Sequence, residues 1–323
     1  MKNGLSRRQL LRAIAQTAAV CGVGAAAPIR AADNRQSSGL TVGISTLGFS
    51  GHTNAELAKE LSAAGFGTIQ LFLLQKDSSF WKYNSRADVS SLTPIRCKEI
   101  ASTYRDAGLD IHSIGVYTNL MHPDETELKA NLAYFEAMMA IGDHMGVHTF
   151  VSEAGHYYDA KVPAPHVPQD LQDETWPRMV ATARKLDEMA ARHDAKVLFE
   201  PYFQSFFASA KRVRLFVEEV NSPRIRVLLD PANLIELNDL NEMFQQLAPW
   251  IDCLHAKDRK YHTNRGVAAG KGDVDYKKFV SLAATHTPSA PLILEYVGPT
   301  DYLDARAHLR NALQACGIPE KKR

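Results

Sequence analysis

The feature that most constrains the fold of this chain is a regular alternation of short apolar runs with longer amphipathic segments. From Leu40 onward, eight β-branched or apolar runs each precede a segment with helical spacing. Eight strand–helix pairs fit a closed (β/α)8 barrel, whose usual size is about 250 residues. The first turn, from Thr46 to Gly51, contains no GxGxxG pattern, which disfavours a doubly wound nucleotide-binding sheet. We therefore predict an α/β fold, a single-domain (β/α)8 TIM barrel in residues 40–316.

The predicted strands share β-branched and apolar composition, and they span residues 41–45, 68–73, 110–116, 147–152, 196–200, 225–230, 251–256 and 292–296. The predicted helices share a 3.6-residue apolar period, and they span residues 54–64, 94–107, 125–145, 172–193, 209–221, 240–248, 275–285 and 301–315. Residues that favour helix starts precede or begin four of them: Thr93, Asp124, Ser209 and Asp239. Glycines that favour helix ends follow three of them: Gly65, Gly108 and Gly146.

The N-terminal segment has the composition of a targeting signal. Arg7 and Arg8 precede two leucines and a weakly apolar run from Ala13 to Ala27. A charged start followed by apolar and small residues is typical of export signals, and the paired arginines resemble the twin-arginine type. We predict a twin-arginine export signal in residues 1–32, a linker in 33–39 and a C-terminal tail in 317–323. A tail with an incidental arginine pair is the alternative.

An exported protein of this kind would be periplasmic or secreted, with the twin-arginine export machinery as a partner. The apolar run is too short for a stable membrane span. Lys and Arg total 37 and Asp and Glu total 36, so the overall charge balance argues against a nucleic-acid partner. The sequence leaves open whether the chain forms a homo-oligomer.

Cysteine usage gives no sign of a disulfide framework. After the predicted signal, three widely spaced cysteines remain, which are Cys97, Cys253 and Cys316. An odd number without a short spacing pattern favours small buried residues. An oxidised Cys97–Cys316 pair remains an alternative.

Polar residues end the last four predicted strands: Glu200, Asp230, His255 and Glu295. Barrel enzymes work at this carboxyl end of the strands, and charges there require pairing or a bound cation. The four residues are separated by 30, 25 and 40 residues, close to the roughly 30 residues of one βα unit. Neighbouring strands would therefore let them converge. Three carboxylates and one imidazole favour Mn2+, Mg2+ or Co2+. For any one of them alone, a salt-bridged or solvated group is the ordinary explanation.

The predicted strands and loops also place other residues near this site. Lys257 follows His255 by two positions, so it faces the same side of the strand and is predicted to add positive charge there. A salt bridge to a carboxylate such as Asp258 is the alternative. Two inserted loops, residues 81–92 and 155–173, are predicted to cover the site.

Several side chains near these loops are predicted to contact substrate. Glu153, His148 and His156 are expected near the end of the fourth strand, although lone residues of this kind are more often structural. Aromatic residues suited to stacking on a sugar are Phe80, Trp81, Tyr157 and Tyr158, and Trp81 is the one we assign to substrate binding. Their alternative role is to pack the loops against the barrel.

Five short motifs resemble those of xylose isomerase-like TIM barrels, closest to the sugar phosphate isomerase/epimerase group that includes ketose 3-epimerases. The motifs are Phe199-Glu200-Pro201, Leu229-Asp230-Pro231-Ala232-Asn233, His255-Ala256-Lys257-Asp258, Gly270-Lys271-Gly272-Asp273-Val274-Asp275 and Leu294-Glu295. The resemblance implies one divalent metal ion, often Mn2+, bound by Glu200, Asp230, His255 and Glu295. It also implies that the two glutamates act as acid and base. Ketose epimerases tend to carry a histidine where this chain has Asn233, which we expect to bind a substrate hydroxyl.

These observations predict a metal-dependent sugar isomerase or epimerase with Glu200, Glu295 and Lys257 as its catalytic residues. The reaction would remove a proton next to a carbonyl through a metal-stabilised enediolate. Export disfavours a phosphorylated substrate and favours a free sugar or a keto-glycoside. The alternatives are a lyase or hydrolase of 3-keto-glycosides and a non-catalytic sugar-binding protein on the same scaffold.

Overall fold

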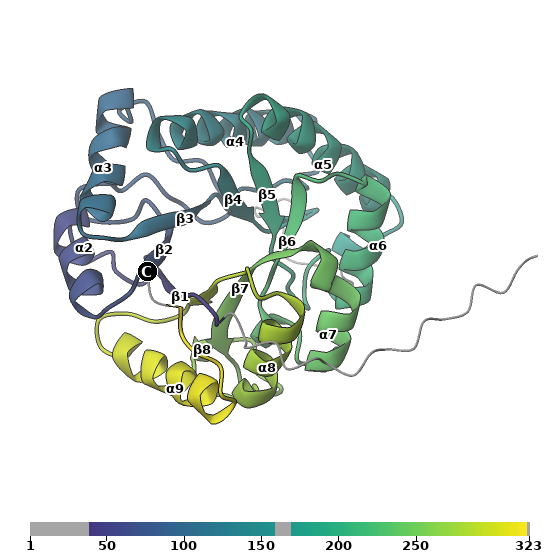
Figure 1. The fold of residues 1–323 in the computed structure, drawn as a ribbon. Coiled ribbons are helices and arrows are strands. Elements are labelled where there is room, and N and C mark those ends of the chain that lie inside the picture. Colours follow the sequence, from purple (N-terminus) through teal and green to yellow (C-terminus); the bar gives the residue numbers. More distant parts are fainter. Residues whose placement is uncertain (1–38, 159–168, 322–323) are drawn as a thin grey trace, which may run out of the picture. The chain divides into compact units, whose positions relative to one another are not determined.

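Eight parallel strands close into a ring in the computed structural model of the chain, which describes residues 39–158 and 169–321 (Figure 1). Their bounds are β1 Val42–Ser45, β2 Thr68–Leu71, β3 Asp110–Gly115, β4 Thr149–Ser152, β5 Lys196–Phe199, β6 Ile225–Leu229, β7 Ile251–Asp258 and β9 Leu292–Leu294. Each strand pairs with its neighbour in chain order, and β9 pairs with β1 to complete the ring. The predicted export signal, most of the predicted linker and the middle of the loop at 155–173 lie outside the described residues.

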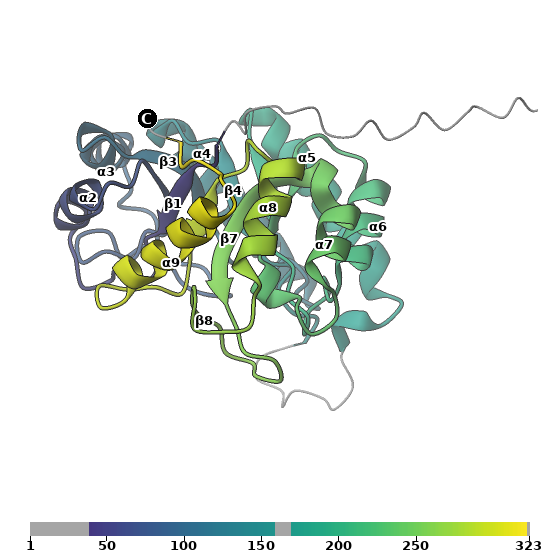
Figure 2. The same cartoon turned by 60° about the horizontal axis from the view of Figure 1, so that its bottom comes forward.

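Helices surround the strand ring on its outer side (Figure 2). Their bounds are α2 Asn54–Ala63, α3 Pro94–Asp106, α4 Glu125–Met145, α5 Thr175–Arg192, α6 Ala210–Val220, α7 Leu240–Leu247, α8 Tyr276–His286 and α9 Tyr302–Ala315. All eight predicted strands and helices are confirmed to within three residues at each end. The fold is thus a single-domain TIM barrel, as predicted.

The predicted helix caps are also confirmed. The side chains of four residues accept backbone N–H groups of the first helical turn, which are Thr93, Asp124, Ser209 and Asp239. Gly65, Gly108 and Gly146 have φ angles of +81°, +83° and +65°. Glycine adopts this left-handed conformation without the steric cost of a Cβ atom, which is why it ends these helices.

A short ninth strand, β8 Val267–Ala268, was not predicted. It runs antiparallel to the last two residues of β7. Asp258, at the end of β7, accepts the backbone N–H groups of Arg259, Gly270 and Val274. A Cβ atom on Gly272 would lie 2.3 Å from the Asp258 carboxylate. The glycine-rich motif at 270–275 therefore shapes the loop that follows β7.

Side chains alternate between the two faces of each strand and so form two apolar layers, one outside and one inside the strand ring. The larger layer lies between strands and helices, while the smaller one includes the inward-facing residues Val151, Leu198, Leu228, Cys253 and Ile293. Because side chains alternate with a period of two, the residue two positions further also faces inward. Glu200 follows Leu198, Asp230 follows Leu228, His255 follows Cys253 and Glu295 follows Ile293. The pleat therefore turns all four predicted ligands into the barrel at its carboxyl end.

The segment after Cys316 is part of the folded unit through residue 321, although it was predicted as a tail. Leu40 forms an isolated parallel bridge with Glu320, and Ile318 is buried. The three cysteines in the described part of the chain are free, with Cys97 and Cys253 buried, so the alternative Cys97–Cys316 disulfide is absent. Within the described ranges, no helix combines the length and apolar character needed to cross a membrane.

Candidate metal centre and active site

Four side chains from neighbouring strands converge at the carboxyl end of the barrel. Glu200 follows β5, Asp230 follows β6, His255 lies in β7 and Glu295 follows β9. One ligand atom from each lies within 4.8 Å of those of the other three, and all four residues are buried. The structure thus brings together the four residues that the sequence predicted as metal ligands.

The imidazole of His255 has two distinct sides. Its Nδ1 lies 3.3 Å from Glu200 Oε1, 3.4 Å from Glu295 Oε2 and 4.0 Å from Asp230 Oδ2. Its Nε2 lies 2.9 Å from Oε1 of Gln70, a buried residue of β2. A carboxamide oxygen only accepts hydrogen bonds, so it favours the proton on Nε2. When the ring is neutral, the lone pair of Nδ1 therefore faces the carboxylates, which is the arrangement of a histidine metal ligand with a supporting partner.

Glu200 is held in place by two further side chains. The Tyr117 hydroxyl donates to its Oε2 at 2.6 Å, and Asn233 Nδ2 donates to its Oε1 at 2.9 Å. Burial opposes the charge of Glu200, but the positive charges of His255 and Lys257 lower its pKa to about 2. Asn233 was predicted to bind substrate, and it lines the cavity while also fixing Glu200.

Lys257 belongs to the same buried cluster. Its Nζ lies 2.7 Å from Asp230 Oδ2 and 3.2 Å from Glu295 Oε2, and it lies 4.3 Å from the centre of the Tyr296 ring. Burial disfavours its charge, yet the two carboxylates raise its pKa well above the usual value. The side chain faces the cavity as predicted, and its ion-pair partners are the two ligand residues rather than Asp258.

The charges of this cluster fit a divalent cation. Three carboxylates face one lysine, so two negative charges are in excess once His255 is neutral, as a histidine must be when it binds a metal ion. Asp230 Oδ2 accepts no hydrogen bond from the described residues, because Lys257 is close but not in hydrogen-bonding geometry. Without a metal ion, burial lowers the pKa of His255 but Glu295 and Glu200 raise it more, to about 9, so Nδ1 carries a proton that a bound cation would displace. Because buried uncompensated charge is costly, these four residues could hold a metal ion of double charge.

Metal binding is expected to stabilise the protein strongly. At a free Mn2+ concentration of a thousand dissociation constants, linkage adds about 4 kcal/mol to the free energy of unfolding. Thermal unfolding of the metal-free protein, with and without added Mn2+, measures this gain as a rise in Tm. His255→Ala removes a ligand and should lose most of it, whereas the exposed-site control Glu99→Gln on α3 should keep it. An equal Tm rise in His255→Ala would exclude this site as the source.

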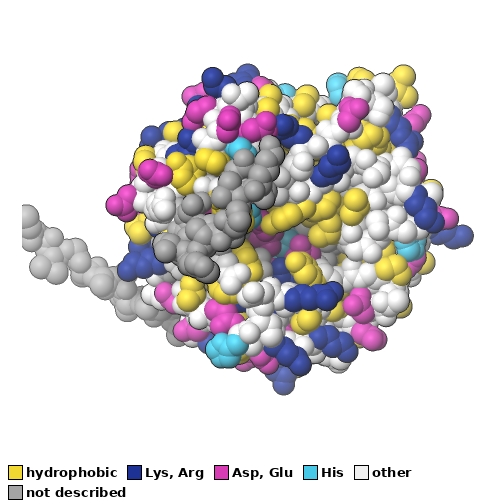
Figure 3. Space-filling view, turned by 180° about the vertical axis from the view of Figure 1, so that it is seen from behind, with side chains coloured by type: hydrophobic (Ala, Val, Ile, Leu, Met, Phe, Trp, Pro, Cys, Tyr) yellow, Lys and Arg dark blue, Asp and Glu magenta, His cyan; other side chains and the backbone are white. Residues whose placement is uncertain are grey.

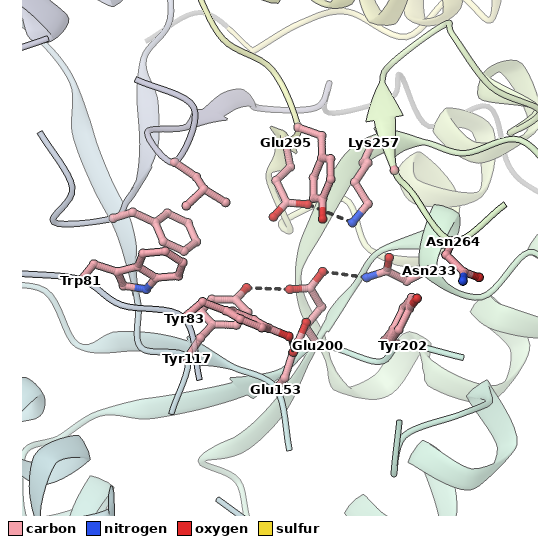
Figure 4. Close-up of a pocket in the computed structure, with 14 residues that line it drawn as sticks. Trp81, Tyr83, Tyr117, Glu153, Glu200, Tyr202, Asn233, Lys257, Asn264 and Glu295 are labelled. Atoms are coloured by element: carbon pink, nitrogen blue, oxygen red, sulfur yellow. Dashed lines mark hydrogen bonds and ion pairs between the residues drawn. The ribbon is translucent and has the colours of Figure 1, made fainter. Parts of the chain in front are cut away.

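A cavity of about 390 Å3 opens above the cluster (Figure 4), within the roughly 300–1,000 Å3 typical of small-molecule sites. Acidic and hydrophobic side chains meet in a hollow on this face of the barrel (Figure 3). The lining residues come from loops after most of the strands: Leu47, Phe72, Trp81, Tyr83, Tyr117, Glu153, Glu200, Tyr202, Asn233, Lys257, Asn264, Gly266, Glu295 and Tyr296.

The other predicted substrate contacts divide into two groups. Trp81 and Glu153 line the cavity. His156 is not among the described residues that line it, because its Nδ1 faces Asp170 Oδ2 at 3.3 Å and its ring packs on Tyr158. The placement of His148 near the end of strand four was wrong, because it precedes β4 and contacts the His193 carbonyl at the other end. Phe80, Tyr157 and Tyr158 are likewise absent from the described lining.

A comparison with known protein families assigns most of the barrel to one of them. The sequence profile described as "Xylose isomerase-like TIM barrel" matches residues 58–312. The chain belongs to this family. No curated protein matches it.

Solved structures of similar fold share little sequence with this xylose isomerase-like barrel, so they show the fold alone. The 3-keto-D-glucoside 4-epimerase YcjR of E. coli has 16% identity and a TM-score of 0.66, over 84% of this chain and 99% of that one. The probable 3-DHS dehydratase AsbF of Bacillus anthracis has 18% identity and a TM-score of 0.65, over 85% and 99%. A xylose isomerase-like TIM barrel protein of Mycobacterium smegmatis in complex with magnesium has 16% identity and a TM-score of 0.65, over 86% and 97%.

Sequence reasoning missed several residues of this xylose isomerase-like site: Gln70, Tyr83, Tyr117, Tyr202, Asn264 and Tyr296. Gln70 and Tyr117 could have been found, because each lies two residues from other inward-facing positions of its strand. Tyr296 has a φ of +55°, a strained conformation for a residue with a side chain. It places the ring over Lys257 directly after the ligand Glu295.

Glu153 is a third carboxylic acid in the cavity of this xylose isomerase-like barrel, outside the four-residue cluster. The Tyr83 hydroxyl donates to its Oε2 at 2.8 Å. Burial and the negative charge of Glu200 raise the pKa of Glu153 to about 7. Near neutral pH this group therefore exists in both protonation states.

Stability should depend on pH through Glu153. Its pKa rises from 4.5 to about 7 on folding, so the folded state favours the protonated form. The resulting stability is complete below pH 4.5 and is lost as pH rises through 7. In metal-free protein, the free energy of unfolding of Glu153→Gln relative to that of wild type should therefore rise by on the order of 1–3 kcal/mol between pH 5 and pH 8. Urea unfolding at both pH values measures it, with the exposed Glu99→Gln as control. A pH-independent difference would contradict the assignment.

Proposed function

We propose that the protein is a divalent-metal-dependent isomerase or epimerase of a non-phosphorylated sugar or keto-glycoside. It would move a proton at the carbon next to a carbonyl, through an enediolate. One observation carries the proposal: Glu200 and Glu295 line the cavity floor as members of a buried cluster suited to a metal ion. A pair of carboxylates suits the removal and return of a proton. The similar epimerase and the similar magnesium complex support this reading by analogy of fold.

The residues of the site have distinct parts in this chemistry. A divalent cation held by the four-residue cluster would polarise the substrate carbonyl and offset the developing negative charge. The Lys257 ammonium, buried beside Asp230 and Glu295, adds a second positive charge near the enediolate oxygen. Asn233 and Asn264 offer amide groups to substrate hydroxyls from the cavity wall.

In the metal-free protein the surroundings of the two glutamates differ. The positive charges around Glu200 lower its pKa and keep it ionised. Burial raises the pKa of Glu295, and the charges of Lys257 and His255 reduce this effect without cancelling it. Both carboxylates line the cavity from different strands, Glu200 after β5 and Glu295 after β9, so they can reach different faces of one substrate carbon. We assign Glu200 as the base for one epimer and Glu295 as the proton donor on the opposite face, with the roles exchanged in reverse.

Solvent exchange tests the proposed function directly. The metal-loaded protein is incubated in deuterated water with a panel of ketoses, aldoses and keto-glycosides. The expected result is deuterium at the carbon next to the carbonyl, together with the inverted epimer or the isomerised carbonyl. The absence of label in every sugar of the panel would contradict proton-transfer chemistry and favour a sugar-binding protein.

Glu153 favours a second candidate function, elimination from a 3-keto-glycoside. In that reaction the C–H bond beside the carbonyl breaks, a C=C bond forms and the C–O bond at the next carbon breaks. Glu153 lines the cavity apart from the metal cluster, and its raised pKa lets it hold a proton for the leaving oxygen. The similarity in fold to a probable dehydratase is consistent with this. Release of free alcohol, reduced at least about 100-fold in Glu153→Gln, would favour elimination over epimerisation.

We also propose that the protein is periplasmic or secreted, because Arg7 and Arg8 precede an apolar run with small residues. Replacing both arginines by lysine should retain the protein in the cytoplasm in an uncleaved form. The unmodified chain should appear in the exported fraction, shortened by about 26–32 residues. Equal export of both forms would contradict the twin-arginine route.

A further inference from the structure

The cavity above the metal cluster has two chemically different sides (Figure 4). On one side, Tyr202, Asn233 and Asn264 present a hydroxyl and two amides from the loops after β5, β6 and β7. On the other side, the loops after β2 and β3 carry four aromatic residues, Phe72, Trp81, Tyr83 and Tyr117, which we call the aromatic wall. Tyr202 and Asn233 already donate to Gln204 and Glu200, and Asn264 Oδ1 accepts from Gln204. The amide groups of the two asparagines keep further donor and acceptor positions for a hydroxylated ring.

The aromatic wall is one continuous assembly of rings. Phe72 and Tyr117 are stacked, with ring centres 5.6 Å apart. Trp81 meets both edge-on, at 5.3 Å and 6.3 Å, and Tyr83 lies over Trp81 and Tyr117 at 6.4 Å and 6.3 Å. Phe72 and Tyr117 are buried, whereas Tyr83 is 53% exposed. The wall therefore runs from the barrel interior to the mouth of the cavity.

The base of the aromatic wall is fixed before any ligand binds. Thr46 Oγ1 donates to the Phe72 carbonyl and accepts from the Phe72 N–H. Gly115 leaves room for the ring, since a Cβ atom there would lie 2.5 Å from Phe72. Rings that are already ordered lose little conformational entropy when a ligand stacks on them.

The hydroxyl protons of the aromatic wall are already engaged. The Tyr83 hydroxyl donates to Glu153 and the Tyr117 hydroxyl donates to Glu200. The buried Nε1 of Trp81 has no acceptor among the described residues. The wall thus presents mainly ring surface and no free donor to the cavity, which suits a flat apolar ring better than a second hydroxyl-rich sugar.

We propose that the aromatic wall is a subsite for an aromatic aglycone, so that the substrate is an aryl glycoside with its sugar over the metal cluster. The placement of the sugar ring rests on the proposed function, while the aromatic subsite rests on the wall itself. Stacking on such a wall contributes about 0.5–1.5 kcal/mol per ring pair beyond the burial of area.

Binding of unreactive glycosides tests this subsite without turnover. The metal-loaded protein is titrated calorimetrically with paired phenyl and methyl β-glycosides of glucose, galactose and xylose, and with cellobiose. For at least one sugar, the phenyl glycoside should bind at least tenfold more tightly than the methyl glycoside. Tyr83→Ser and Trp81→Leu should each reduce this ratio below threefold, because the phenyl glycoside loses more affinity than the methyl glycoside. Tyr261→Ser, an exposed tyrosine outside the described cavity lining, should keep the full ratio.

The outcomes separate the subsite from the proposed reaction. No preference for phenyl glycosides in any pair, or no binding at all, would overturn the subsite. Cellobiose binding more tightly than phenyl glucoside would overturn it in favour of a second sugar. A phenyl preference that both wall variants retain would place the aglycone elsewhere. If the preference is found but no keto-sugar exchanges its proton with solvent, the subsite stands and the proposed reaction fails.

Discussion

In the metal-loaded protein, Glu200→Gln and Glu295→Gln are each expected to slow the interconversion of the two epimers by at least about 100-fold, up to about 10,000-fold. Each variant should nevertheless retain deuterium exchange with solvent in one of the two epimers. A carboxamide cannot accept or deliver the proton, whereas it is nearly isosteric with the carboxylate it replaces. Each glutamate serves one face of the reacting carbon. Glu200→Gln should therefore lose deuterium exchange from one epimer only, and Glu295→Gln from the other.

The structure supplies matched controls for this pair. Both variants are assayed at saturating metal, with metal content measured, because each loses one anionic ligand. Glu153→Gln changes a cavity carboxyl outside the cluster, and epimerisation should retain at least a tenth of its rate. If Glu153→Gln lost exchange while both cluster variants kept it, the proton would pass through Glu153 and the assignment would be wrong.

Lys257→Met is expected to lower the free energy of unfolding of the metal-free protein by about 3–5 kcal/mol, because it leaves buried carboxylates without their cation. Lys257 Nζ lies 2.7 Å from Asp230 and 3.2 Å from Glu295, and its side chain is 5% exposed. A bound divalent metal ion supplies positive charge to the same carboxylates. The loss should therefore shrink when the variant is saturated with Mn2+.

Lys196 provides the matched comparison, since it forms an ion pair with Asp252 at 2.8 Å but its side chain is 52% exposed. Water screens such a pair, so Lys196→Met should cost no more than about 1 kcal/mol. Urea unfolding of wild type and both variants, with and without Mn2+, measures the four differences. Equal losses for the two lysines, or a Lys257 loss unaffected by metal, would contradict the charge balance described for the cluster.

The sequence predicted the barrel and its metal cluster because both follow from periodic patterns. Strands and helices differ in their apolar period, and four polar residues directly follow apolar runs at intervals of about one βα unit. The contact between Gln70 and His255 does not follow from such a pattern. These residues are 185 positions apart, and only closure of the ring brings β2 opposite β7.

Residues on irregular loops were harder to place. Trp81 was expected at the site, but its neighbour Tyr83 was not, because a loop has no period that tells which side chains face inward. His156 lies close to a strand end in sequence, yet its ring contacts Asp170 and does not line the described cavity. Proximity to a strand end in the chain therefore predicts a cavity-lining side chain less well than the two-residue alternation within the strand does.

Pulsed electron paramagnetic resonance of the Mn2+-loaded protein tests the metal centre most directly. One Mn2+ per chain should show coupling to a single imidazole nitrogen, contributed by His255 Nδ1. In His255→Gln this coupling should vanish, and in Asp230→Asn the metal affinity should fall at least tenfold. Mn2+ bound without nitrogen coupling, or binding unaffected by both substitutions, would show that these four side chains do not form the metal site.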